Sequence, residues 1–240
     1  MLDKSQFIRV LELEDVYTNY RNRGSGIKDT GCPACYTIGK DIFKNIKKCP
    51  HCGTQYKLTL AKQEILPDID YLKDLNVMMA HIIGKYLSKD ASVLEVGCAY
   101  GDLLHTIQQN YSRNVTGLDL VNIVRAEYLF PTKILSLEDA HFSKEFDAVI
   151  MVHVIEHLKN PNWCLSHLNK FLKDNGRIFI FTNEADNFPF GCIEDLIKQD
   201  THQQIFTEQG FEHLAVQNDF KVVEFVHRWD YSTFLILEKI

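Results

Sequence analysis

Hydrophobic and polar positions alternate in two rhythms along residues 67–240. Apolar residues spaced three to four apart between Leu72 and Leu87 predict an amphipathic helix. Beyond it, strand-like and helix-like runs alternate, and this order predicts a doubly wound, mostly parallel α/β sheet of seven strands. The expected strands are 92–96, 114–119, 134–135, 146–151, 177–182, 221–226 and 231–237, and the expected helices are 102–110, 163–172 and 207–216. Because the link at 227–230 is too short for a parallel crossover, the last two strands are expected to form an antiparallel hairpin.

Four cysteines precede this region as two C-x2-C pairs with 13 residues between them: Cys32, Cys35, Cys49 and Cys52. Two such turns allow four thiolates to converge tetrahedrally on one Zn²⁺ ion. A pair of redox motifs is the alternative, but redox C-x2-C motifs open a helix inside a βαβ unit, and no such pattern occurs here. We therefore expect a small zinc-ribbon module within residues 1–66, followed by a second domain at 67–240.

Little apolar core can form in a module this short, so zinc is expected to supply most of its folding free energy. His51, inside the second pair, is expected to face solvent from a turn rather than bind the metal. The remaining cysteines are scattered, and we interpret Cys98, Cys164 and Cys192 as packed thiols.

The 240 residues are 45% hydrophobic and 24% charged, an ordinary globular composition. With no apolar run near the roughly 18 residues of a membrane span and no secretory pattern at Met1, we expect a soluble, cytoplasmic protein. Residues 1–66 hold 11 Lys and Arg against 7 Asp and Glu, whereas the rest holds 15 against 25. An acidic main region disfavours nucleic acid as the substrate, while the basic first region keeps that partner open.

The first predicted strand ends in Glu95 and Val96 and runs into a loop that contains three small residues, Gly97, Ala99 and Gly101, separated by Cys98 and Tyr100. Small residues let the backbone approach a ligand at the start of the next helix. A dinucleotide fingerprint would need glycine at position 102, where Asp102 stands, so the loop favours a ligand with an α-amino acid and a nucleoside. Asp119 ends the second strand 22 residues after Gly97, where a carboxylate can accept both ribose hydroxyls.

With four motifs in order, the chain resembles class I S-adenosylmethionine-dependent methyltransferases over about residues 70–240. The motifs are Val93–Asp102, Gly117–Asp119, Phe146–Leu158 and Leu172–Phe179. The resemblance implies a Rossmann-like methyltransferase fold with S-adenosylmethionine as cofactor, and Ala99 stands where the family commonly has glycine. It also implies a cofactor site made of Glu95, Gly97, Cys98, Ala99, Tyr100, Gly101, Asp119, Leu120, Leu137, Glu138, Asp139, Met151 and Val152. A surface turn explains Glu138 and Asp139 nearly as well as contact with adenine.

The candidate catalytic residues are His153, Glu156 and His157, directly after the fourth predicted strand. If this segment is helical, the three side chains share one face. Glu156 and His157 could simply fix the loop by hydrogen bonds, or His157 could act as a general base, since imidazole titrates near neutral pH. An inverted zinc-protease motif also fits the spacing, but its place after a buried strand of a cofactor fold argues against that reading.

A second divalent metal is a sharper alternative for the same residues. Small-RNA terminal 2′-O-methyltransferases and some quinone O-methyltransferases resemble this arrangement, with Glu-x-x-Glu-His around a divalent ion. Here His153 replaces the first glutamate, and His202 lies where the RNA enzymes place another histidine. Imidazole-rich ligation by His153, Glu156, His157 and His202 would favour Zn²⁺ or Mn²⁺ over Mg²⁺. His202 is alternatively a substrate contact or a turn residue, and Asn183 and Phe188 are further candidates for acceptor recognition.

These observations favour methyl transfer to an oxygen or carbon nucleophile of a small molecule or of a sugar or glycan precursor. The four-cysteine module is similar to that of sugar C-methyltransferases of natural-product pathways, in which the corresponding histidine resembles a base. One alternative is an RNA methyltransferase that grips its substrate through the zinc ribbon. Another is a non-catalytic module that binds S-adenosylmethionine and docks partners. The sequence predicts no particular oligomeric state.

Overall fold

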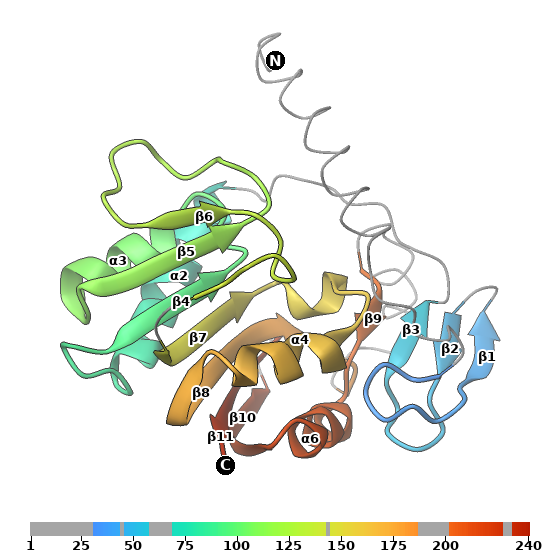
Figure 1. The fold of residues 1–240 in the computed structure, drawn as a ribbon. Helices are drawn as coiled ribbons and strands as arrows, with labels where there is room; N and C mark the ends of the chain where they lie inside the picture. The colour runs from blue at the N-terminus through green and yellow to red at the C-terminus, as the bar shows by residue number, and fades with distance from the viewer. Residues whose placement is uncertain (1–30, 44–45, 58–68, 143–144, 187–201, 228–231) are drawn as a thin grey trace, which may run out of the picture.

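Two β-sheets organise the chain in a computed structural model that describes residues 31–43, 46–57, 69–142, 145–186, 202–227 and 232–240 (Figure 1). The larger sheet has seven strands in the order β10-β11-β8-β7-β4-β5-β6. Its strands are β4 (Ser92–Val96), β5 (Asn114–Asp119), β6 (Thr132–Ile134), β7 (Phe146–Val152), β8 (Leu172–Asn183), β10 (Phe220–His227) and β11 (Ser232–Lys239). Strands β6, β5, β4, β7 and β8 run parallel, and β11 is antiparallel to both β8 and β10. The predicted mostly parallel, seven-stranded α/β sheet and the C-terminal hairpin are confirmed.

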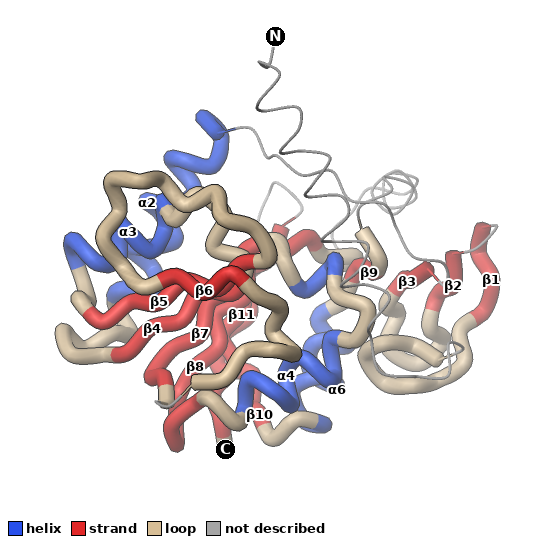
Figure 2. Tube along the Cα trace, turned by 45° about the horizontal axis from the view of Figure 1, so that its top comes forward, coloured by secondary structure: helices blue, strands red, loops and turns tan. Residues whose placement is uncertain are grey.

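Helices cover both faces of this sheet, so its central strands are buried on both sides (Figures 1 and 2). The helices are α2 (Ile69–Gly84) and α3 (Asp102–Asn110) on one face, and α4 (Pro161–Asn169) and α6 (Glu208–Gln217) on the other. Successive strand residues alternate between the two cores: Val93 packs with α2 and α3, and Leu94 with α4 and α6. Burial on both faces explains why these strands are continuously apolar in sequence.

Four predicted elements are displaced in the structure. Helix α2, expected between Leu72 and Leu87, spans Ile69–Gly84. The third strand is Thr132–Ile134 rather than 134–135. Helix α4 begins at Pro161, because the side chain of Asn160 accepts the N–H of Trp163 (3.0 Å), and Leu172 already belongs to β8. Strand β8 passes through the turn-like residues 174–176, where Asn175 takes a left-handed φ of 59° and the register against β7 shifts.

The smaller sheet consists of β1 (Lys40–Phe43), β2 (Ile46–Lys48), β3 (Gln55–Lys57) and β9 (Gln204–Ile205), in that order. Strands β1 to β3 lie between and after the cysteine pairs, whereas β9 comes from the region after β8. The predicted domain boundary at residues 66 and 67 lies outside the described residues. Among the described residues, no helix is long and apolar enough to cross a membrane.

Candidate functional site

The glycine loop turns sharply at the carboxyl end of β4. Gly97, Ala99 and Gly101 all have left-handed backbone, with φ of 74°, 44° and 81°. For Ala99 this conformation costs about 1–2 kcal/mol, a strain that a bare glycine would avoid. A Cβ on Gly97 would lie 2.6 Å from Cγ2 of Val154, so the loop packs directly against the segment that follows β7. The carboxyl ends of β4 and β7 therefore meet at one edge of the large sheet.

Asp119 ties the loop after β5 to the glycine loop. Its Oδ2 accepts the N–H of Ala99 (2.8 Å) and its Oδ1 accepts the N–H of Val121 (3.1 Å). Burial raises the pKa of this carboxyl, and the two backbone hydrogen bonds work in the opposite direction. Each carboxylate oxygen has a second lone pair, so Asp119 can still accept hydroxyl donors from a ligand.

Glu95 is a buried carboxyl one strand position before the loop. Burial raises its pKa well above the ordinary value, and the charges of Asp119 and Asp102 act in the same direction. Its Oε2 has no hydrogen-bond partner among the described residues. A donor or cation brought to this edge of the sheet would therefore relieve a buried polar atom.

The other predicted cofactor residues lie at the same carboxyl edge. Tyr100 is half-buried beneath the guanidinium of Arg125, 5.5 Å from its ring centre. Leu137 is buried in a turn that follows β6, where Ser136 donates to Oδ2 of Asp139 (2.9 Å). The rest of the set occupies the ends of the strands or the turns after them: Cys98, Leu120, Glu138, Met151 and Val152. Cys98 is 4% exposed and Cys164 1%, as expected of packed thiols, and Cys192 lies outside the described residues.

The candidate catalytic segment is a 3₁₀ turn, η1 (Ile155–His157), rather than the α-helical face considered from spacing. His153 precedes it in left-handed backbone (φ 50°), and its N–H donates to the carbonyl of Phe181 on β8 (2.8 Å). This conformation turns the His153 ring so that Nδ1 donates to Oε1 of Glu156 (3.0 Å). His153 and Glu156 are thus paired by a backbone reversal and not by a helix.

Glu156 is fully buried beside three histidines. Burial alone would raise its pKa, but the hydrogen bond from His153 and the charges of His157 and His202 outweigh it and lower the pKa to about 2. The carboxylate is therefore the form of Glu156 at neutral pH. Its Oε2 has no hydrogen-bond partner among the described residues.

His202 lies beside His157, although 44 residues separate them in the chain. Their ring centres are 4.9 Å apart, and His202 is 8% exposed. Ligand atoms of Glu156, His157 and His202 all lie within 4.8 Å of one another, whereas His153 belongs to no such group. Of the candidate acceptor residues, Asn183 ends β8 next to this region, and Phe188 lies outside the described residues.

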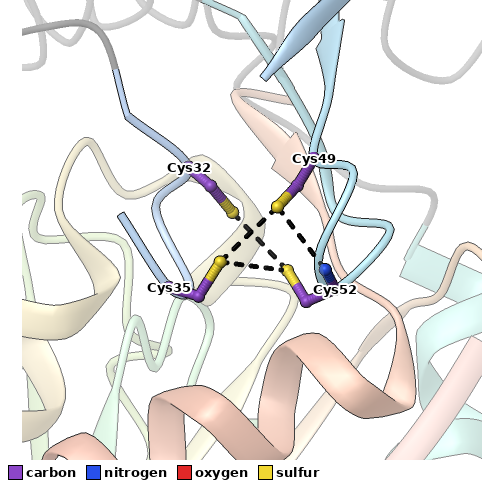
Figure 3. Close-up of side chains that lie close together, drawn as sticks. All are labelled: Cys32, Cys35, Cys49 and Cys52. Atoms are coloured by element: carbon purple, nitrogen blue, oxygen red, sulfur yellow. Dashed lines mark hydrogen bonds between the residues drawn. The ribbon is translucent and has the colours of Figure 1, made fainter. Parts of the chain in front are cut away.

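The four cysteines of the N-terminal module converge on one point (Figure 3). Sγ–Sγ distances are 3.6 Å for Cys32–Cys52, 3.5 Å for Cys35–Cys49 and 3.6 Å for Cys35–Cys52. A tetrahedral zinc site with Zn–S bonds of about 2.3 Å has edges of about 3.8 Å, so this donor set fits a tetrahedral ion. His51 is exposed, as expected, and stacks on His213 of α6 with ring centres 4.5 Å apart.

An ion pair that sequence spacing did not reveal joins the ends of β8 and β10. His227 donates from Nδ1 to the buried carboxylate of Glu184, at 2.8 and 2.6 Å from its two oxygens, and its Nε2 lies 3.4 Å from Glu208. The hydrogen bond that His227 donates to Glu184 raises the pKa of His227 above its ordinary 6.5. These residues lie 43 positions apart in the chain, and no motif links them.

We expect the pair to make the free energy of unfolding depend on pH. A raised folded-state pKa means that the contribution is complete below pH 6.5 and is lost as pH rises through the pKa of folded His227. Because the His227 side chain is 38% exposed, solvent screens the pair, and the loss should stay under about 1 kcal/mol. Urea unfolding on both sides of this range should show the loss in the wild type and a smaller one in His227→Gln. An equal pH slope in both proteins would contradict this assignment.

In a comparison with known proteins, residues 71–225 match the family model described as a methyltransferase domain. The mitochondrial ubiquinone biosynthesis O-methyltransferase of Dictyostelium discoideum is 31% identical over 112 residues. That match covers 38% of this chain and 35% of the relative, so the chain spans about a third of that protein's length.

Solved structures show the same fold. An assigned O-methyltransferase from Nostoc punctiforme superposes with a TM-score of 0.61 at 13% identity, covering 70% of this chain and 56% of that one. The magnesium protoporphyrin IX methyltransferase of Synechocystis, solved with bound SAH, gives a TM-score of 0.54 at 16% identity. It covers 74% of this chain and 90% of that chain. At these identities the likeness extends to the fold alone.

Proposed function

The chain belongs to the methyltransferase-domain family, and from that premise we propose that it methylates an oxygen or carbon nucleophile of a small molecule or of a sugar or glycan precursor. S-adenosylmethionine would supply the electrophilic methyl group on its sulfonium. The observation that carries the proposal is the meeting of the glycine loop, Asp119 and η1 at one edge of the sheet. At this edge Gly97 packs on Val154, which precedes Glu156 by two residues.

The chain's own residues divide the work between cofactor and acceptor. The left-handed loop from Gly97 to Gly101 lets backbone approach the amino-acid part of the cofactor, and Asp119 accepts the ribose hydroxyls. Glu95, buried and short of one partner, suits a donor such as an ammonium group. Leu137, Glu138 and Asp139 would flank the base from the turn after β6.

His157 is proposed as the general base for the acceptor. As the acceptor's oxygen or carbon bonds to the methyl group, the methyl–sulfur bond would break with its electron pair left on the departing thioether sulfur, and the acceptor's proton would pass to the imidazole of His157. Glu156, ionised and held by His153, stabilises the imidazolium that results. His202, whose ring lies 4.9 Å from that of His157, would contact the acceptor or orient the base.

Asp119→Ala should weaken S-adenosylmethionine binding by roughly 10- to 100-fold, since charge-assisted hydrogen bonds to two hydroxyls are lost. The substitution also frees the Ala99 N–H that holds the loop. Titration calorimetry measures the effect, with the exposed Asp174→Ala as the matched control. Equal affinities in the two variants would remove Asp119 from the cofactor site.

A divalent ion held by Glu156, His157 and His202 is a second candidate for the same centre. One carboxylate and two imidazoles within 4.8 Å form a donor set that suits Zn²⁺ or Mn²⁺, and such an ion would orient an acceptor hydroxyl. Under this candidate, His202→Ala loses as much activity as His157→Ala, and a chelator abolishes transfer that Mn²⁺ restores. Under the general-base assignment, transfer survives a mild chelator that leaves the zinc of the four-cysteine module bound, and His202→Ala retains part of the activity.

The cysteine module is proposed to hold one structural Zn²⁺ through Cys32, Cys35, Cys49 and Cys52. Two observations support this proposal: the Sγ–Sγ distances of 3.5 and 3.6 Å, and the pKa shifts that the thiols cause in one another. The hydrogen bond from Cys32 lowers the pKa of Cys52 to about 4, and the same contact raises the pKa of Cys32. Thiolate ligands persist in a reducing compartment, which supports a cytoplasmic location.

The experiment that tests the substrate class uses S-adenosylmethionine labelled on its methyl group, the purified protein and an extract of the source cell. Products are separated by size, and the large fraction is treated with ribonuclease. Label in the small-molecule fraction is the expected result, and the acidic charge of residues 67–240 supports it over a polyanionic acceptor. Label in a ribonuclease-sensitive fraction would overturn it in favour of an RNA methyltransferase. Cofactor binding without transfer to any fraction would favour the non-catalytic module.

A further inference from the structure

Strand β9 completes the sheet of the cysteine module, although the chain between them spans the whole parallel sheet (Figure 1). Gln55 pairs with Ile205 and Tyr56 with Gln204. Directly before β9, Gln203 accepts the N–H of Lys57 on its carbonyl (2.9 Å) and donates from Nε2 to the carbonyl of Lys57 (2.7 Å). The module is thus hydrogen-bonded to residues 203–205 along the length of β3.

The same segment holds the catalytic turn from its other side. The side-chain amide of Gln204 is 1% exposed and donates to two carbonyls, those of Ile155 (2.9 Å) and Leu158 (2.6 Å). Glu156 and His157 lie between these two carbonyls. The N–H of Gln203 donates in addition to the carbonyl of Glu156 (2.9 Å). Two consecutive glutamines therefore bind the carbonyls of Ile155 and Glu156 in η1 and the carbonyl of Leu158 directly after it, in addition to the bond of the Leu158 N–H to Ile155 (3.3 Å) that closes the turn.

The turn at residues 49–53, called here the cysteine knuckle, is hydrogen-bonded to Thr207, which follows β9 by two residues. The hydroxyl of Thr207 donates to the carbonyl of Cys52 and also accepts the N–H of Gly210 (3.0 Å) as the cap of α6. A Cβ on Gly53 would lie 3.0 Å from Cγ2 of Thr207, and one on Gly210 would lie 2.4 Å from Oγ1 of Thr54. The cysteine knuckle packs closely against Thr207, the cap of α6. A change in the shape of the knuckle must therefore move Thr207.

We propose that Gln204 is a positioning residue for Glu156 and His157, and that β9 makes their placement depend on the metal state of the four-cysteine module. The inference rests on the proposed function for the roles of Glu156 and His157. Contact runs without a gap from Cys52 through Thr207 and β9 to η1. Loss of the metal would release the knuckle, loosen β9 and let η1 drift away from its place beside the glycine loop.

Hydrogen exchange of the full chain tests the inference without an acceptor. Gln204→Met keeps the length of the side chain and removes both donors, and the exposed Gln209→Met is the matched control. Exchange across residues 153–158 should rise roughly 10- to 100-fold in Gln204→Met and stay at the wild-type level in Gln209→Met. Exchange in β4 and β5 should not change.

Metal removal by a chelator should raise exchange across residues 153–158 in the wild type as well. If β9 carries the effect, the rise on metal removal will be smaller in Gln204→Met than in the wild type, because part of the contact is already gone. The inference would be overturned if the chelator left exchange across residues 153–158 unchanged in the wild type and Gln204→Met also showed the wild-type rate there.

Transfer assays separate this inference from the proposed function. With the labelled cofactor and extract, Gln204→Met should lower kcat while the dissociation constant for S-adenosylmethionine stays unchanged. A wild type that transfers no label, but whose exchange responds as expected, would refute the proposed function and leave the coupling intact. Full transfer by Gln204→Met with unchanged exchange would refute the positioning role and leave the proposed function intact.

Discussion

His157→Ala should reduce methyl transfer by about 10²- to 10⁴-fold, the usual contribution of a positioned general base. The imidazole lies in η1 next to ionised Glu156, within the group of ligand atoms that also includes His202. Because His157 takes no part in the glycine loop or in the contacts of Asp119, the affinity for S-adenosylmethionine should remain unchanged. Initial rates of label transfer into the small-molecule fraction, together with titration calorimetry, measure both quantities.

The exposed His141→Ala is the control for this substitution, and it should transfer methyl groups at the wild-type rate. Methyl transfer from a sulfonium can also proceed by positioning alone. A His157→Ala variant with the full rate would assign the site to that mode and limit Glu156 and His157 to fixing the loop. A loss of cofactor affinity instead of rate would move His157 into the cofactor site.

Removing one cysteine ligand should unfold the N-terminal module. Structural zinc contributes on the order of 10–16 kcal/mol in small zinc domains, and a module this short has little other core to replace it. Cys52→Ser should therefore lose the one zinc per chain that we expect in the wild type, and its thermal unfolding should begin at a lower temperature. Zinc content after chelator-free purification and a thermal scan give the result.

The buried Cys164→Ala is the matched control, since Cys164 is 1% exposed and lies outside the module. It should keep the zinc and lose only packing energy. Cys32, Cys49 and Cys52 share one buried cluster with strands of the large sheet, so the large sheet should lose some stability in Cys52→Ser without unfolding. A Cys52→Ser protein with wild-type zinc content would contradict the four-cysteine site.

Local signals predicted the elements on either side of the glycine loop well. Strands β4 and β5 and helix α3 have the expected bounds because apolar runs and the glycine loop punctuate them within a few residues. Helix α6 begins one residue after the predicted start at 207, because Thr207 is its N-cap. Helix α4 and strand β8 were displaced because Asn160 starts the helix early and Asn175 lets the strand continue through a turn-like sequence.

The surroundings of η1 depend on long-range contacts that a single sequence does not encode in spacing. The left-handed backbone of His153 replaced a helical face with a 3₁₀ turn. Residues Gln203 and Gln204 carry no motif, and their importance arises only because β9 returns to the module to pair with β3. The pair of Glu184 and His227 likewise forms because β10 and β8 end at the same edge.

Binding of S-adenosylmethionine is the most direct test that this chain holds the cofactor between the glycine loop and Asp119, because the measurement needs no acceptor. Titration of the full chain with S-adenosylmethionine, followed by hydrogen exchange on the complex, measures both. We expect one molecule bound per chain, with exchange slowed in the loop 97–101, around Asp119 and in the turn at 137–139. Absence of binding, or protection confined to other parts of the chain, would contradict it.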